Sequence, residues 1–172
     1  MPLECLIPRE AIARRVAELA GEITREYSDT AGLAVVVLLN GALIFAADLV
    51  RQLPMPLTMD TLAVASYGKA GSTGQVAFRA PLKLDIAGRD VLVVDDILDT
   101  GLTLRRVMDS LRQAGAARVR SCVLLDKSVA RHPEGMPRAD FTAFQVPDKF
   151  IVGYGLDAEE RYRNLPDVMA LI

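Results

Sequence analysis

Hydrophobic residues recur along this chain in two patterns, one helical and one continuous. Pro8 to Tyr27 has apolar residues at helical spacing and predicts an amphipathic helix, with the proline suited to its first turn. Leu33 to Leu39 is apolar throughout, as expected of a strand that is buried on both faces. The next apolar stretch, Ala42 to Leu53, predicts a helix that packs under this strand and ends before Pro54.

The same two patterns continue to the end of the chain. Thr58 to Tyr67 and Gln75 to Leu82 are β-like and flank a glycine-rich turn, which predicts a long hairpin with a mobile tip. Val91 to Val94 predicts a central strand, and Leu102 to Ala114 a helix closed by Gly115. Further strands are expected at 119–125, 141–146 and 150–154, and an apolar tail at 168–172.

Strands that alternate with helices indicate an α/β fold with a mostly parallel central sheet flanked by helices. The chain has 172 residues, of which 51% are hydrophobic, and this is enough for a sizeable core. Because no repeat or linker divides the sequence, we expect a single domain over residues 1–172.

The charge and cysteine content narrow the possible functions. The formal net charge is −2 and the arginines are scattered, so the sequence lacks the basic face that nucleic-acid binding requires. No apolar run approaches the length of a membrane span, and the first residues lack the pattern of a signal peptide. Cys5 and Cys122 lie far apart, without metal-ligand spacing. We therefore expect a cytoplasmic protein that binds neither nucleic acid nor a membrane.

The most informative segment is Asp95 to Thr103, which follows the predicted central strand. Three carboxylates precede a Thr-Gly-Leu-Thr turn at the start of the next helix. Helix N-termini attract anions, whereas these carboxylates would repel one. A ligand that combines a phosphate, a sugar diol and a bound cation resolves this conflict. The turn could then surround the phosphate, Asp95 and Asp96 could face the diol or the metal, and Asp99 would remain for chemistry.

Four other polar segments follow predicted strands, and ligands of parallel sheets bind beyond the carboxyl ends of strands. Taken singly, each has an ordinary interpretation. Asn40-Gly41 could be a common turn and Lys127 a solvated lysine. Phe150 could be a core aromatic or present a flat face to a heterocycle. Arg163 could be a surface arginine or clamp a pyrophosphate.

Taken together, these segments resemble a known family. Asp95 to Thr103 resembles the phosphoribosyl-pyrophosphate motif of the type I phosphoribosyltransferases, which has two acidic residues, two apolar residues and then Asp-Thr-Gly-x-Thr. Val146 to Asp157 is similar to a segment of one subfamily, the hypoxanthine-guanine phosphoribosyltransferases. Leu6 to Leu19 resembles that subfamily's amino end, and Ala65 to Gly68 its mobile loop. The resemblance covers nearly the whole chain.

This resemblance implies the type I phosphoribosyltransferase fold, with a small hood formed by the chain ends and a long mobile hairpin loop. It also implies roles for individual residues. The phosphoribosyl group would contact Asp95, Asp96, Asp99, Thr100, Gly101, Leu102 and Thr103. The purine would contact Lys127, Phe150 and Ile151, and pyrophosphate would contact Leu39, Asn40, Gly41 and Arg163. The resemblance also suggests a cis peptide within the Leu39 to Gly41 segment.

The remaining implied roles concern the cofactor, the chemistry and the mobile loop. Mg²⁺ would be bound by Asp157, with Asp95 and Asp96 facing it. Asp99 would act as the general acid/base near purine N7, and Ser66 and Tyr67 would close over the site.

Two departures from the family pattern affect these roles. Asn40 stands where the pyrophosphate loop commonly carries lysine, so a side-chain or subunit contact would be lost, while a role of the backbone amides would remain. Ala65 replaces the first serine of the mobile loop, and we expect that change to be minor.

The implied reaction joins hypoxanthine or guanine to phosphoribosyl pyrophosphate and releases pyrophosphate, in a homodimer or homotetramer. Two alternatives remain open. One is a regulator on the same fold that senses phosphoribosyl pyrophosphate without turnover, although such a protein would need a basic face or a DNA-binding extension. The other is a xanthine or pyrimidine phosphoribosyltransferase, and Lys127 with Phe150 favours 6-oxopurines over pyrimidines.

Overall fold

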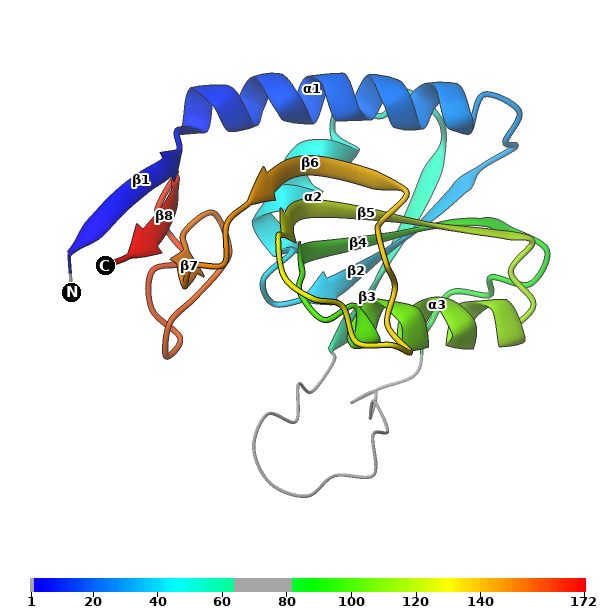
Figure 1. The fold of residues 1–172 in the computed structure, drawn as a ribbon. Helices are drawn as coiled ribbons and strands as arrows, with labels where there is room; N and C mark the ends of the chain where they lie inside the picture. The colour runs from blue at the N-terminus through cyan, green and yellow to red at the C-terminus, as the bar shows by residue number, and fades with distance from the viewer. Residues whose placement is uncertain (1, 64–81) are drawn as a thin grey trace.

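The computed structural model describes residues 2–63 and 82–172, whose strands form two β-sheets (Figure 1). The larger sheet has the strand order β3-β2-β4-β5-β6, and every neighbouring pair is parallel. Its strands are β2 (Leu33–Leu39), β3 (Leu57–Ala63), β4 (Asp90–Leu98), β5 (Arg118–Lys127) and β6 (Phe141–Val146). The helices are α1 (Arg9–Glu26), α2 (Leu43–Val50) and α3 (Leu102–Gln113). The predicted α/β fold with a mostly parallel sheet is confirmed.

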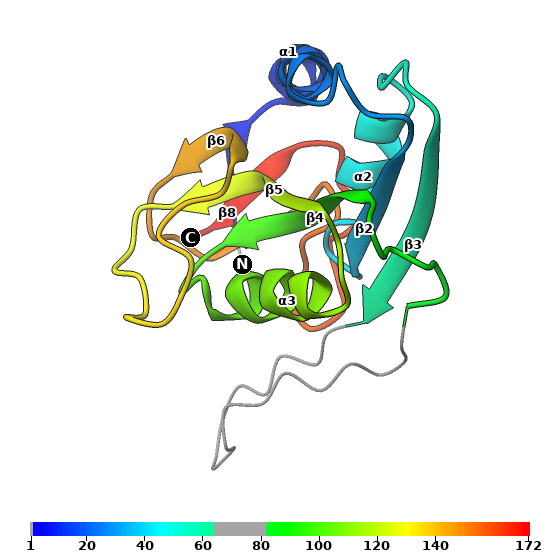
Figure 2. The ribbon, with the colours of Figure 1, turned by 90° about the vertical axis from the view of Figure 1, so that its right-hand side faces the viewer.

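Both faces of the large sheet are covered by helices. Figure 2 shows α1 and α2 on one side of the sheet and α3 on the other. Side chains of β2 alternate between the two layers, with Val35 and Val37 in the core under α1 and α2, and Val36 in the core under α3. This explains the unbroken apolar run of β2, because every position meets a hydrophobic layer.

Two helices test the predicted boundaries. The helix expected from Pro8 is confirmed as α1, and the hydroxyl of Tyr27 just beyond it donates to the carbonyl oxygen of Val91 at 3.0 Å. The helix expected over residues 42–53 is wrong at its end, because α2 stops at Val50. The amides of Gln52 and Leu53 donate to carbonyl groups three residues back, and this tighter turn leads into the proline that follows.

A second, three-stranded sheet joins the two ends of the chain. Its antiparallel strands lie in the order β1 (Leu3–Ile7), β8 (Val168–Leu171) and β7 (Ile151–Val152). We call this sheet, with residues 153–167, the hood. The strand predicted at 150–154 is therefore too long, because Gly153 and Gly155 take left-handed backbone angles, with φ of 92° and 104°. The hood that the resemblance implied is confirmed, and both termini lie in it (Figure 1).

The predicted long hairpin falls largely outside the described residues, which stop at Ala63 and resume at Leu82. Its first part contains β3, which pairs in parallel with β2. Within the described ranges, no helix is long and apolar enough to cross a membrane.

Candidate active site

The carboxyl ends of four strands meet along one edge of the large sheet. These ends are Leu39 of β2, Leu98 of β4, Lys127 of β5 and Val146 of β6. In Figure 1 the arrowheads of β2 and β6 point toward the hood. Parallel strands end on the same side, so segments that are distant in sequence converge here. We call this edge, with the facing hood, the candidate site.

The acidic pair Asp95 and Asp96 lies inside β4 and not in a loop, so that part of the prediction is wrong. The parallel pairing of β4 with β5 continues as far as Leu98 opposite Asp126, which keeps the backbone extended through both carboxylates. Burial raises the pKa of each carboxyl group, and the neighbouring charge of Asp96 raises the pKa of Asp95 further. Two adjoining carboxylates of this kind favour a cation or hydroxyl donors.

Residues 99–103, which we call the phosphate loop, connect β4 to α3. Gly101 stands at the N-cap with a left-handed φ of 80°. A Cβ atom there would overlap the backbone of Met136, so both the conformation and the close approach require glycine. Residues between Asp95 and Leu104 line a cavity of about 60 Å³ beside the first turn of α3. The first amides of a helix are donors suited to a phosphate.

The predicted pyrophosphate segment contacts both the acidic strand and the hood. The Leu39–Asn40 peptide bond is cis. A Cβ atom at Gly41 would overlap the Asp96 carboxylate, and one at Gly155 would overlap the Gly41 carbonyl oxygen. The close packing of these two glycines therefore brings the end of β2 against β4 on one side and against the hood on the other.

Arg163 and Asp157, predicted to contact pyrophosphate and metal, form an ion pair in the hood. Nη2 of Arg163 lies 2.7 Å from Oδ1 of Asp157 and 3.2 Å from Oε2 of Glu160, and Nη1 donates to the carbonyl oxygen of Gly155 at 2.8 Å. The positive charge of Arg163 also lowers the pKa of Asp96, opposing the effect of burial. Arg163 is thus held within the hood by these contacts and is not a free surface arginine.

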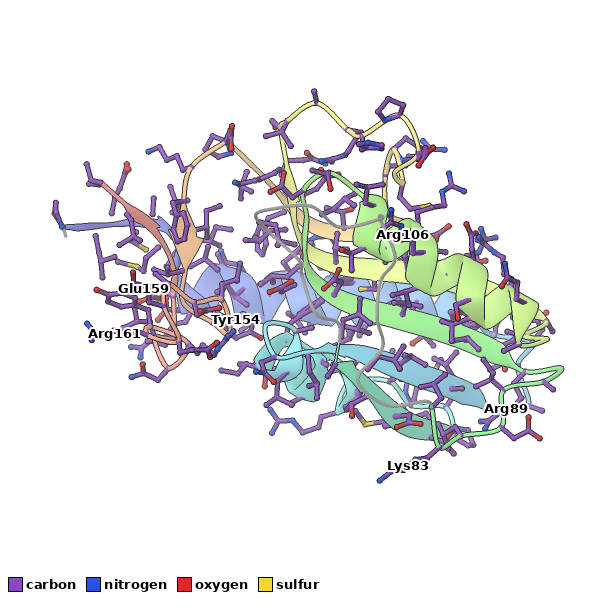
Figure 3. The ribbon with its side chains drawn as sticks, turned by 90° about the horizontal axis from the view of Figure 1, so that it is seen from below. Lys83, Arg89, Arg106, Tyr154, Glu159 and Arg161 are labelled. Carbon is purple, nitrogen blue, oxygen red and sulfur yellow. The ribbon has the colours of Figure 1, made fainter. Side chains whose placement is uncertain are left out.

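The rest of the hood is held against α2. Figure 3 shows Tyr154 beside α2, with Glu159 and Arg161 farther out on the same loop. The hydroxyl of Tyr154 donates to Oδ2 of Asp48 in α2 at 2.6 Å. This hydrogen bond fixes the hood at the edge of the sheet.

Lys127 is mostly buried at the end of β5, so its interpretation as a solvated lysine is wrong. Its Nζ lies 3.1 Å from Oδ1 of Asp148 and 4.0 Å from Oδ2 of Asp99. The ammonium group therefore lies between the phosphate loop and the segment that follows β6. Asp148 was missed in the sequence, although it precedes Phe150 by two residues; its pairing with a residue of another strand is a tertiary contact that no local pattern reports.

Phe150 is exposed over 60% of its surface, which excludes the interpretation of a core aromatic. The next residue, Ile151, is buried in β7 and pairs with Ala170. Nearby, Nζ of Lys149 lies 2.6 Å from Oε2 of Glu4 in β1. The segment is thus fixed by the hood on both sides of Phe150, whose ring stays accessible to a ligand.

Two further predictions concern the mobile loop and the metal. Ser66 and Tyr67 lie outside the described residues. Within the described ranges no three His, Cys, Asp or Glu side chains cluster as a metal site would. A metal held by one or two carboxylates and by substrate oxygens is compatible with that finding.

Comparison with known proteins agrees with this geometry. The family model described as the phosphoribosyl transferase domain matches residues 6–159. The hypoxanthine-guanine phosphoribosyltransferase of Aquifex aeolicus is 47% identical over 167 residues, which are 96% of this chain and 93% of the relative. That of Bacillus subtilis is 45% identical over 167 residues, with 96% and 91% covered.

A solved structure agrees as well. The crystal structure of a hypoxanthine-guanine phosphoribosyltransferase from Bacillus anthracis, with a HEPES molecule in the active site, matches with a TM-score of 0.91, 37% identity and 98% of both chains covered. The fold and these matches define a phosphoribosyltransferase. Within that class, the chain belongs to the hypoxanthine-guanine phosphoribosyltransferase family.

Proposed function

We propose that this protein is a cytoplasmic purine-salvage enzyme that converts hypoxanthine or guanine and phosphoribosyl pyrophosphate to IMP or GMP and pyrophosphate. The observation that carries the proposal is the meeting of the phosphate loop with Lys127, whose Nζ lies 4.0 Å from Oδ2 of Asp99. On a 6-oxopurine, N7 and the 6-oxo oxygen are neighbours. A single flat base can therefore contact both side chains at once.

The phosphoribosyl group would bind along β4 and the phosphate loop. The amides and hydroxyls of Thr100 to Thr103 would hold the 5′-phosphate at the N-terminus of α3. Asp95 and Asp96 would accept hydrogen bonds from the ribose hydroxyls. The left-handed Gly101 supports this assignment, because it lets the loop turn sharply into the first turn of α3.

The base would bind between Lys127 and Phe150. Lys127 would donate to the 6-oxo oxygen in competition with Asp148, and Phe150 would stack on the ring while the backbone of Ile151 meets its edge. An adenine amino group would leave the lysine donor unpaired, which costs about 1–3 kcal/mol or more for a charged group. The site should therefore disfavour adenine.

In the reaction, the bond from the anomeric carbon to pyrophosphate breaks as N9 of the base attacks that carbon. Asp99 would take the proton from N7 as the new bond forms, a contribution of roughly 10²–10⁴-fold. Arg163 and the backbone of Leu39 to Gly41 would stabilise the departing pyrophosphate. We propose that Ser66 and Tyr67 close over the site and exclude water.

Mg²⁺ is the cofactor that these residues would hold. Asp95 and Asp96 adjoin in β4, and their raised pKa values mean that both carboxylates are costly to ionise without a countercharge. Asp157 would provide a carboxylate oxygen from the hood, with substrate oxygens between it and the acidic pair, and oxygen ligands of this kind suit Mg²⁺. When bound, the ion would neutralise charge on the pyrophosphate.

The proposal is tested by the absorbance change on mixing the protein with hypoxanthine, phosphoribosyl pyrophosphate and Mg²⁺. We expect a spectral shift from base to nucleotide, matched by stoichiometric release of pyrophosphate. Calorimetric binding of phosphoribosyl pyrophosphate with no spectral change for any base would instead support the sensing regulator. A shift with xanthine alone would support the xanthine enzyme.

We further propose that the protein forms a homodimer or homotetramer. The apolar helix α2 leaves Leu43 exposed over 54% of its surface, next to the candidate pyrophosphate segment. A second copy would cover such a surface. Sedimentation equilibrium should give a mass of two or four chains, and Leu43→Glu should lower it; a monomer at micromolar concentration would contradict this proposal.

A further inference from the structure

Arg131 lies in the connection between β5 and β6, and its guanidinium group reaches the ends of two strands. Nη1 donates to three backbone carbonyl oxygens, those of Leu98 at 3.2 Å, Lys127 at 3.1 Å and Asp99. Nε donates to the carbonyl oxygen of Pro137 at 3.3 Å. One side chain thus links the ends of β4 and β5, beside the candidate general base Asp99 and at the candidate purine ligand Lys127.

The guanidinium group is itself held in place. Its Nη2 donates to Oδ1 of Asp126, a buried residue of β5, and Nε2 of Gln145 in β6 donates to Oδ2 of the same carboxylate at 3.2 Å. A buried carboxylate must be paired, so removing either partner is costly. Asp126 and Gln145 therefore fix the plane of Arg131 from two neighbouring strands.

The next two carbonyl groups of the phosphate loop are held by the same connection. The amide of His132 donates to the carbonyl oxygen of Thr100 at 3.0 Å, and the amide of Met136 donates to that of Gly101 at 2.9 Å. Together with Arg131, these contacts give each of the four consecutive carbonyl groups of residues 98–101 a donor within residues 131–136.

This arrangement decides where the loop amides point. In a trans peptide unit, the carbonyl group and the following N–H point in opposite directions. The amides of residues 99–102 therefore point away from the β5–β6 connection. Within the described part of the chain, those of Thr100, Gly101 and Leu102 donate to no backbone acceptor. Successive amides that share one direction form the kind of concavity that binds anions.

We propose that Arg131, anchored by Asp126, is a positioning residue of the phosphate site. It holds the carbonyl groups at the end of β4 so that the following amides face the 5′-phosphate, and it does not touch the substrate. The proposal rests on the proposed function, which assigns that phosphate to this loop. The planar guanidinium fork is essential, because it reaches the carbonyl groups through Nη1 and Asp126 through Nη2, whereas the single nitrogen of a lysine could not occupy both positions.

Arg131→Lys separates this geometry from charge. Calorimetry with ribose 5-phosphate should show weaker binding by about 10- to 100-fold, the size expected when supporting contacts misplace a binding group. The KM for phosphoribosyl pyrophosphate should rise accordingly, while the KM for hypoxanthine changes less. Arg138→Lys, at an exposed arginine of the same connection, is the matched control and should leave both values unchanged.

Asp126→Asn keeps an acceptor for Arg131 but removes the negative charge of the carboxylate. This variant should also weaken ribose 5-phosphate binding. It replaces the lysine variant if thermal denaturation shows that Arg131→Lys is not folded. Folded variants that bind ribose 5-phosphate as tightly as the wild type would overturn the proposal, whatever their turnover. If the wild type binds ribose 5-phosphate and the variants lose it, the positioning role holds. Absence of nucleotide formation by the wild type would then count against the proposed function alone.

Discussion

At the scale of single residues, the two candidate cations of the site each face a carboxylate that substrate must compete with. Lys127 faces Asp148 at 3.1 Å, and Arg163 faces Asp157 at 2.7 Å. Substrate oxygens carry partial or full negative charge, so they can replace these carboxylates without leaving a buried charge unpaired. The ion pairs thus hold both cations in place until substrate binds.

Lys127→Ala tests the purine contact. Loss of a hydrogen bond from a charged donor costs about 1.5–3 kcal/mol, so kcat/KM for hypoxanthine should fall about 10- to 100-fold by steady-state kinetics. The matched control is Lys149→Ala, which removes a lysine of the neighbouring segment that pairs with Glu4. Equal losses in the two variants would argue against a specific contact of Lys127 with the base.

Asp99→Asn tests the proton transfer. The amide keeps the shape of the side chain but cannot accept the N7 proton, so kcat should fall by roughly 10²–10⁴-fold while binding of phosphoribosyl pyrophosphate is retained. Asp109→Asn is the control, because Asp109 pairs with Arg112 on the surface of α3. Near-normal turnover of the Asp99 variant would remove its acid/base role.

At the scale of elements, long apolar runs could be interpreted correctly from the sequence alone. Every position of β2 meets a hydrophobic layer, so its pattern needed no tertiary information. The ends of strands and helices were harder to predict, because contacts with other elements determine where they fall. Pairing with β5 extends β4 through Asp95 and Asp96, and tight turns after Val50 shorten α2.

An ion pair at the opposite end of these strands gives a pH-dependent test. Nε and Nη2 of Arg118 in β5 donate to the two carboxylate oxygens of Asp90 in β4, at 3.0 and 2.9 Å. The hydrogen bonds from Arg118 lower the pKa of Asp90 below its usual value. The stabilisation is therefore complete above the unfolded pKa of about 4 and is lost as pH falls through the lower native pKa.

Arg118→Met should lower the free energy of unfolding at pH 7 by about 1–3 kcal/mol. The difference from the wild type should shrink on acidification below pH of about 4, as measured by urea unfolding across that range. Arg112→Met, which breaks an exposed pair on α3, should cost only about 0–1 kcal/mol. A difference that is constant with pH would show that Asp90 does not contribute through ionisation.

At the scale of the whole molecule, the convergence of the site could be predicted because parallel strands end on one side. The sequence placed Leu39 to Gly41, the phosphate loop and Lys127 after separate strands, and the fold brings these segments to one edge. Asp148, Glu160 and Arg131 could not be found this way. Their partners lie on other elements or are backbone carbonyl groups, which leave no pattern in the sequence.

Several expectations remain predictions. The single domain, the Mg²⁺ site, the subunit number and the roles of individual residues rest on chemical argument, and the mobile-loop pair Ser66 and Tyr67 lies outside the described residues. The roles of the individual residues share one first experiment, because they presuppose nucleotide formation from phosphoribosyl pyrophosphate.

That experiment is a competition assay. Equal concentrations of hypoxanthine, guanine, xanthine and adenine are incubated with the protein, phosphoribosyl pyrophosphate and Mg²⁺, and the nucleotides are quantified by mass spectrometry. The site predicts IMP or GMP as the main product, with pyrophosphate in equal amount and little AMP. Formation of AMP in excess of the 6-oxopurine nucleotides, or of no nucleotide at all, would contradict the account.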